Sequence, residues 1–187
     1  YFSHLKKYDE QNIQQKIDNP VWHLHQGNPI NNNIPVSYTL LLNLASVCYA
    51  NDIDIVWGYV SRYSPNLKRT TELNSLIQLS VNYYKDKIEP FKNYRLPSEK
   101  EKQGILQLIN TLSKLDEKTS SEEIQSIVFS IGKKLEYDNL RDWFKALYET
   151  VLGQGEGPRM GSFIKLYGIE QTRTLLEKVL HGQLTND

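Results

Sequence analysis

Four glycines fall between Gly153 and Gly161, in a C-terminal third that otherwise has helical spacing. Glycine reaches backbone conformations closed to other residues, so this cluster indicates a tight connection of a specific shape. Pro158 fixes one φ angle at a predicted first helical position. Arg159 follows it directly, and its planar cation with five donors suits a phosphate or a base edge. The simpler interpretation of the same residues is a plain helix–Schellman turn–helix connector with a solvated arginine.

Basic residues alternate with aromatic residues in three parts of the chain, of which the last includes Arg159. These clusters are Arg62-Tyr63 with Lys68-Arg69, the segment 83–95 and the segment 159–167. Aromatic rings stack on unpaired bases while arginine and lysine hold phosphates, at roughly 1–3 kcal/mol per stacked base. The pattern predicts a single-stranded RNA surface. The alternative is that the twelve tyrosines cap helix ends in an ordinary core.

Other site chemistries find little support in the residues. The dinucleotide-binding pattern needs a glycine where Pro158 stands, and the Gly-Lys-Ser/Thr of the NTPase loop is absent. His23 and His25 would supply two metal ligands, but no Cys-x-x-Cys or His-x-x-x-His accompanies them. We therefore expect loop histidines bonded to backbone and no metal. Cys48 lies within an apolar helical pattern, where we expect it to pack as a small hydrophobe.

Composition limits the class of protein. In 187 residues, 22 basic side chains balance 22 acidic ones, so any contact with a polyanion must be a local patch. The single cysteine cannot form an internal disulfide and fits a reducing compartment. The longest apolar block, around 40–44, is too short for a membrane span, and the first residues do not resemble a signal peptide. We expect a soluble, cytoplasmic piece of a longer protein.

Helical spacing appears almost throughout, and strand alternation almost nowhere. The capping pairs that predict helix starts are Ser98 with Glu101, and either Thr119 with Glu122 or Ser120 with Glu123. The expected helices lie within 2–17, 35–48, 52–63, 70–88, 98–112, 120–131, 140–152, 162–167 and 170–180. Residues 21–35 read as a long loop, pinned by Trp22. The prediction is an all-α, compact multi-helix bundle of about 8–10 helices. Residues 1–34 form an N-terminal helix and Pro/Asn-rich loop, and residues 35–187 form a helical domain in one structural unit with them.

Several segments resemble the class I (archaeal-type) lysyl-tRNA synthetases. They are residues 19–25, 37–44, 56–63, 82–84, 94–97, 123–125, 143–148 (WFKALY) and 152–163 (LGQGEGPRMGSF), of which the last is the most specific. The likeness spans roughly residues 19–180. Two positions depart from the family pattern. Gly155 stands where an acidic residue is usual, and Met160 stands where phenylalanine is common, which would loosen the loop and weaken stacking.

The resemblance implies the C-terminal α-helix cage of such an enzyme, which receives the anticodon arm of lysine tRNA. The parent enzyme activates lysine with ATP and Mg²⁺ and attaches it to the 3′ end of the tRNA. Sequences resembling its His-Ile-Gly-His and Lys-Met-Ser-Lys-Ser signatures are absent from these residues. We therefore expect a fragment that binds without catalysing, needs no cofactor, is a monomer, and works with its own catalytic domain and with tRNA but no membrane.

Lysine anticodons are rich in uridine, whose pairing edge has one donor and two acceptors. Recognition of that edge needs splayed bases, a stacking partner and matching polar groups. Aromatic–basic adjacency and family motif position together predict contacts with the anticodon arm from Trp57, Arg62, Tyr63, Tyr94, Arg95, Gln154, Arg159 and Lys165. Two alternatives remain. One is a helical protein-interaction module whose tyrosines meet another protein, and the other is a hydrolase that uses His23 and His25 with a metal.

Overall fold

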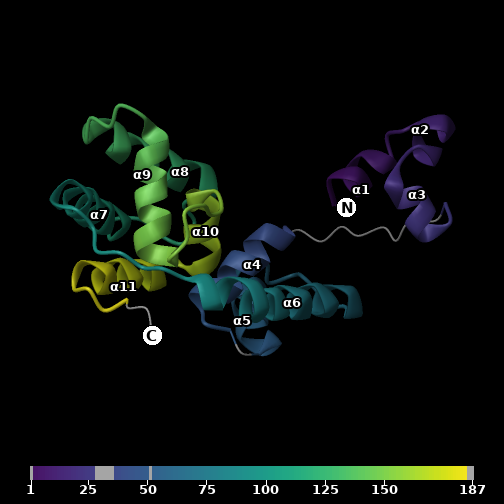
Figure 1. The fold of residues 1–187 in the computed structure, drawn as a ribbon, viewed down its shortest axis with the longest axis horizontal. Coiled ribbons are helices and arrows are strands. Elements are labelled where there is room, and N and C mark those ends of the chain that lie inside the picture. The colour runs from purple at the N-terminus through teal and green to yellow at the C-terminus, as the bar shows by residue number, and fades with distance from the viewer. Residues whose placement is uncertain (1, 28–35, 51, 185–187) are drawn as a thin grey trace. The chain divides into compact units, whose positions relative to one another are not determined.

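The computed structural model describes residues 2–27, 36–50 and 52–184, and these ranges contain helices and no β-strand. This confirms the predicted all-α class. The chain divides into two compact units, Tyr1–Pro35 and Val36–Asp187, which are described separately (Figure 1). That both belong to one structural unit stays a prediction. None of the helices in the described ranges is both long enough and apolar enough to span a bilayer.

The N-terminal unit consists of three short helices. They are α1 (Phe2–Tyr8), α2 (Ile13–Ile17) and α3 (Pro20–His25). Asn12 and Gln15 form a reciprocal capping box at the start of α2, with bonds of 3.0 and 3.1 Å. The unit closes where the hydroxyl of buried Tyr8 donates to the carbonyl of Gly27 at 3.1 Å.

The prediction of a loop from residue 21 onward is wrong for its first part, because α3 occupies it. The Asn19 side chain accepts from the Val21 amide at 3.0 Å, and Pro20 takes the first helical position. The Asn-Pro pair that ends α2 therefore also begins α3. Trp22 does pack on the following turn, where its ring lies against Gly27. The rest of the predicted loop, 28–35, lies outside the described residues.

The second unit holds eight α-helices in its described residues. They are α4 (Tyr38–Val47), α5 (Ile53–Tyr63), α6 (Thr71–Tyr83), α7 (Glu99–Leu112), α8 (Ser121–Lys134), α9 (Leu140–Leu147), α10 (Met160–Tyr167) and α11 (Ile169–Leu180). A π-helical turn (Tyr84–Ile88) and a 3₁₀ turn (Glu89–Phe91) prolong α6, and a second π-helical turn (Tyr148–Leu152) prolongs α9. With the N-terminal unit, the described residues form eleven α-helices against the 8–10 expected.

Local capping explains where the long helices begin. Ser98 with Glu101 caps α7 as predicted, and Ser120 with Glu123 caps α8, which decides between the two predicted pairs. The apolar faces of α7 to α11 then share one core around Trp143. The Trp143 ring is fully buried, and its Nε1 donates to the carbonyl of Val128 at 3.0 Å.

The helices α8 and α10 pack closely because Gly161 lacks a side chain. A Cβ atom at that position would overlap the carbonyl oxygen of Ser121. The Gly161 amide instead donates to Oε1 of Gln125 at 2.7 Å. The prediction that Pro158 opens this helix is wrong, since α10 begins at Met160. The carbonyl of Pro158 accepts the Tyr148 hydroxyl at 2.8 Å, and this bond holds the proline in the connection.

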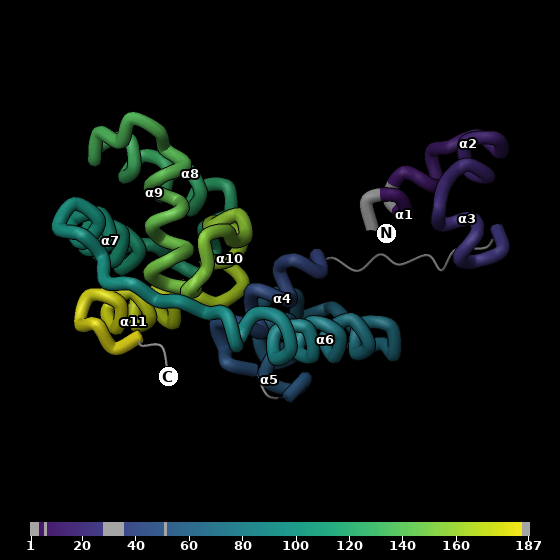
Figure 2. The backbone as a smooth tube through the Cα atoms, viewed as in Figure 1, coloured from purple at the N-terminus to yellow at the C-terminus, as the bar shows by residue number. Residues whose placement is uncertain are grey.

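The helices α4, α5 and α6 pack together beside this core, with α10 in contact with both α4 and α5. The helix α4 ends earlier than expected, because Tyr49 adopts a left-handed φ of 47°. Cys48 is therefore the C-cap of α4 and not a mid-helix residue. Residues 92–98 run as an extended connection from the end of α6 to α7 (Figure 2).

Candidate functional site

The glycine-rich connection after α9 is docked on the extended segment 92–98. Gly153 ends the π-helical turn with a left-handed φ of 67°, which favours glycine. Its carbonyl accepts the Asn93 amide at 2.9 Å. The Tyr94 ring covers the Gly153 backbone, and a Cβ atom there would lie 3.1 Å from the ring. Two parts of the chain that lie about 60 residues apart thus form one surface.

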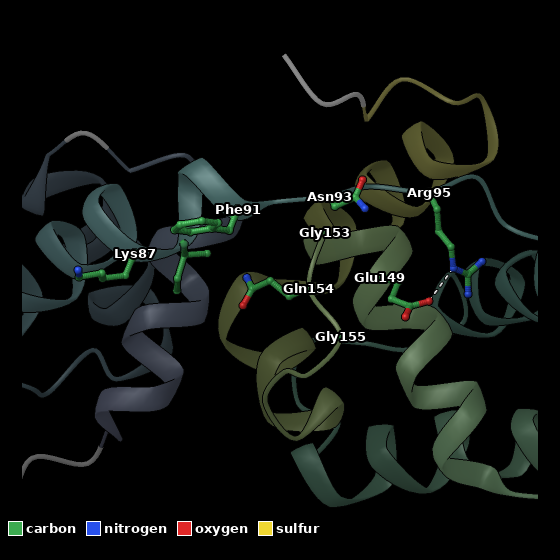
Figure 3. A pocket seen from close by; sticks show the side chains of 9 residues that line it. Lys87, Phe91, Asn93, Arg95, Glu149, Gly153, Gln154 and Gly155 are labelled. Atoms are coloured by element: carbon green, nitrogen blue, oxygen red, sulfur yellow. Dashed lines mark hydrogen bonds and ion pairs between the residues drawn. The ribbon is translucent and has the colours of Figure 1, made fainter.

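A pocket of about 440 Å³ opens between these two segments (Figure 3). Its walls are formed by Lys87, Ile88, Phe91, Asn93, Arg95, Glu149, Gly153, Gln154 and Gly155. The Phe91 side chain is 76% exposed, which is unusual for a large apolar ring. No atom lies within 4 Å of a Cβ position at Gly155, so the loop leaves open space there. A flat ring, an amide and exposed backbone therefore border one cavity.

Two carboxylates neutralise the charge of Arg95 in the pocket wall. The guanidinium makes a bidentate pair with Glu101 at 2.7 and 2.8 Å. Its Nε donates to Glu149 at 2.6 Å (Figure 3). The Arg95 bonds hold the pKa of the Glu101 carboxyl below its usual range. Arg95 therefore fixes the segment 92–98 to α7 and to the turn after α9.

A lysine lies behind the pocket in a cage of tyrosines. Lys92 Nζ donates to the carbonyl of Ser46 at 2.6 Å and to the Tyr94 hydroxyl at 3.0 Å. Nζ also lies 4.4 Å from the ring centroid of Tyr49 and 5.1 Å from that of Tyr84. Burial lowers the pKa of Lys92 to about 8. This cluster joins the end of α4 to the segment that carries Phe91.

Gln154 lies in the pocket on the glycine-rich connection. Its Nε2 donates to the hydroxyl of Ser46 at 3.0 Å, although the two residues are 108 positions apart. Its own amide nitrogen donates to the Tyr148 carbonyl at 3.3 Å. Oε1 of Gln154 has no bond to another part of the described chain. Oε1 of Gln154 can therefore accept a hydrogen bond from a ligand while Nε2 stays bonded to Ser46.

The predicted residues of α5 do not line this pocket. Trp57 and Tyr63 are half-buried, and Arg62 is exposed over the Tyr59 ring at 5.5 Å. Arg69 lies 5.5 Å from the Trp57 ring centroid. Tyr59 in turn stacks on Tyr167 of α10, with ring centroids 5.3 Å apart. The basic–aromatic pattern on α5 thus continues onto α10.

The predicted cations of the α10 region have partners on α8 and on the turn that precedes it. Arg159 is exposed, and its nearest carboxylate oxygen, on Glu122, is 3.8 Å away. Lys165 is half-buried and donates to the carbonyl of Glu117. Met160 is a core residue at 3% exposure, so it offers no stacking surface.

The structure therefore brings together only part of the predicted set. Arg95 and Gln154 line the pocket, and Tyr94 packs behind Gly153. The other five predicted residues do not line it. They are Trp57, Arg62, Tyr63, Arg159 and Lys165. Conversely, the sequence-based list lacked Phe91 and Lys87, although both lie in the basic–aromatic segment 83–95. The basic–aromatic pattern of that segment indicated the region. Which of its residues line the pocket depends on their exposure in the folded domain.

The two histidines considered as metal ligands lie in the last turn of α3, so the expectation of loop histidines is wrong. Pro20 and the Asn19 cap turn this stretch into a helix. Among the described residues, no three His, Cys, Asp or Glu side chains gather as a metal site requires.

The structure is an all-α domain with a polar–aromatic pocket, and sequence comparison identifies its relatives. The chain is 42% identical over 97% of its length to a lysine–tRNA ligase of Rickettsia felis, 42% over 98% to that of Rickettsia peacockii, and 41% over 96% to that of Rickettsia bellii. It spans about a third, 35%, of the length of each. The chain is thus homologous to part of these lysine–tRNA ligases. No protein-family model and no solved structure matches it.

Proposed function

We propose that this chain is the anticodon-arm-binding domain of a class I lysyl-tRNA synthetase, and that its pocket takes an unpaired base of the anticodon. The observation that carries the proposal is the pocket that joins Phe91 to Gln154. An exposed aromatic ring beside a side-chain amide suits a splayed base, which needs both a stacking face and a polar partner. The motifs shared with class I enzymes support the class, and the homology to lysine–tRNA ligases supports lysine tRNA as the partner.

The residues of the site divide the work. Phe91 stacks on the base, and the Gln154 amide meets its pairing edge. The open backbone at Gly155 lets the nucleotide approach closely. Arg95 shapes the wall, because its charge is already matched by two carboxylates. Outside the pocket, Arg62, Arg159 and Lys165 hold phosphates, with Trp57 and Tyr63 beside them.

In the complete enzyme this domain would work beside a catalytic domain that activates lysine with ATP and Mg²⁺ and transfers it to the tRNA. We expect the domain alone to bind RNA without catalysing either step and without a cofactor. The same assignment makes the protein cytoplasmic.

The test is a titration of this chain with the anticodon stem–loop of lysine tRNA. The comparison stem–loop keeps the stem and replaces the anticodon uridines with cytidines. We expect tighter binding of the lysine stem–loop, since the pocket contributes only when the base fits. Equal affinity for the two RNAs would refute base recognition. Failure to bind either would refute the RNA function and favour a helical protein-interaction module.

A further inference from the structure

The orientation of the Gln154 amide is set from outside the pocket. Its Nε2 donates to the hydroxyl of Ser46 at 3.0 Å. Ser46 lies on α4, is fully buried, and does not line the pocket. A buried hydroxyl holds its partner firmly, because breaking the bond would leave polar atoms without water. The amide is therefore not free to turn over to suit whichever base enters.

Ser46 is itself fixed to the segment that carries the stacking ring. Its carbonyl accepts from Lys92 Nζ at 2.6 Å, one residue after Phe91. The loop that carries Gln154 is tied to the same segment through the bond from the Asn93 amide to the Gly153 carbonyl, 2.9 Å long. The stacking ring and the amide thus share one frame. A base on the ring would meet the amide at a fixed height and in a fixed register.

We infer that Ser46 is a positioning residue that determines which pyrimidine the pocket accepts, and that it selects uridine over cytidine. The inference rests on the proposed function. One N–H of Gln154 Nε2 is used in the bond to Ser46. The side chain therefore presents Oε1 as an acceptor and its other N–H as a donor to the base, and the two cannot exchange places. Uridine carries its single donor between two acceptors, so an acceptor–donor pair fits it from either side. Cytidine carries its donor at one end of the edge and must shift along the ring to pair, which a fixed frame resists.

The variant Ser46→Ala removes the hydroxyl without filling the space. We expect the preference for uridine over cytidine in the stem–loop titration to fall about threefold to tenfold, the range of one hydrogen bond. The dependence of affinity on salt should not change, because no phosphate contact is lost. The matched control is Ser80→Ala. Ser80 is equally buried on α6, and its hydroxyl bonds within that helix to the Ile77 carbonyl at 2.7 Å. This control should keep the preference.

A second variant, Gln154→Asn, tests the same bond from the glycine-rich connection. The shorter side chain keeps an amide but does not reach Ser46, so it should lose the same preference. The double variant should lose no more than either single one. A purely structural role for Ser46 would weaken both RNAs equally and leave their ratio intact, which would overturn the inference. If Ser46→Ala does not fold, Ser46→Cys decides in its place, because it keeps the volume of the side chain and weakens the acceptor for Gln154 Nε2. An unchanged ratio in a chain that binds the lysine stem–loop overturns the inference only, whereas no binding by the wild type overturns the proposed function with it.

Discussion

Removing the exposed ring of Phe91 gives a direct test of the pocket. The side chain is 76% exposed at the end of a 3₁₀ turn, so Phe91→Ala removes little buried surface. We expect the free energy of unfolding to change by less than about 0.5 kcal/mol, as for other surface substitutions. The loss should therefore appear in binding and not in folding.

The size of the binding loss follows from the chemistry of stacking. A base stacked on an aromatic side chain contributes about 1–3 kcal/mol. At about 1.4 kcal/mol per factor of ten, Phe91→Ala should weaken the lysine anticodon stem–loop about 5-fold to 150-fold. Phe91→Tyr should keep most of the affinity, because it keeps the ring. The measurement is a fluorescence-anisotropy titration at fixed salt, paired with urea unfolding of each variant.

The matched control is Phe129→Ala. Phe129 is also exposed, at 40%, but lies on α8 with Lys133 Nζ 4.9 Å from its ring centroid, and it does not line the pocket. Its removal should leave affinity unchanged. If Phe91→Ala stays within twofold of the wild type, the pocket does not stack a base. If Phe129→Ala costs as much as Phe91→Ala, the contact is general to exposed rings.

Three further predictions concern charge and packing. Arg159→Ala should lower the slope of log affinity against log salt concentration by about 0.7–1. It should not change stability, since the ion pair of Arg159 with Glu122 is exposed and 3.8 Å long. An unchanged slope would show that Arg159 does not contact a phosphate. Burial lowers the pKa of Lys92 from 10.5 to about 8, so the unfolded chain holds that proton more tightly and stability rises with pH between these values. Urea unfolding at pH 7.5 and 9.5 should show a larger rise in the free energy of unfolding for the wild type than for Lys92→Met. The same change with pH in both proteins would contradict the prediction. Gly161→Ala should cost about 2 kcal/mol or more in thermal unfolding, because its Cβ would overlap the backbone of α8.

The sequence predicted the helices best where a local cap marks the start. The Ser98 and Ser120 boxes bond within four residues, so each is complete in the sequence itself. The Asn19-Pro20 pair led to the wrong prediction of a loop from residue 21, because two local effects of proline act there together. The residue before a proline leaves the helical region, yet a proline also suits a first turn, and both effects operate there.

The site was harder to predict because its contacts join distant positions. Arg95 has the sequence environment of an RNA contact, but Glu149, 54 residues away, engages it. Gln154 was found through its motif, whereas its partner Ser46 lies 108 residues earlier and has no local signal. Phe91 belonged to a recognised basic–aromatic cluster. Only its exposure separates it from a core ring, and exposure depends on the whole fold.

The distribution of charge around the pocket indicates how specificity and affinity are divided. Two carboxylates engage Arg95, and Lys92 lies in its tyrosine cage, so neither supplies a free charge to the cavity. Among the described residues that line the pocket, Lys87 is exposed and makes no ion pair. Apart from Lys87, the lining offers a base stacking and hydrogen bonds, which vary little with salt, whereas phosphate contacts vary steeply. High salt should therefore weaken both stem–loops together and preserve the preference between them, because the cations that we propose to hold the backbone, Arg62, Arg159 and Lys165, do not line the pocket.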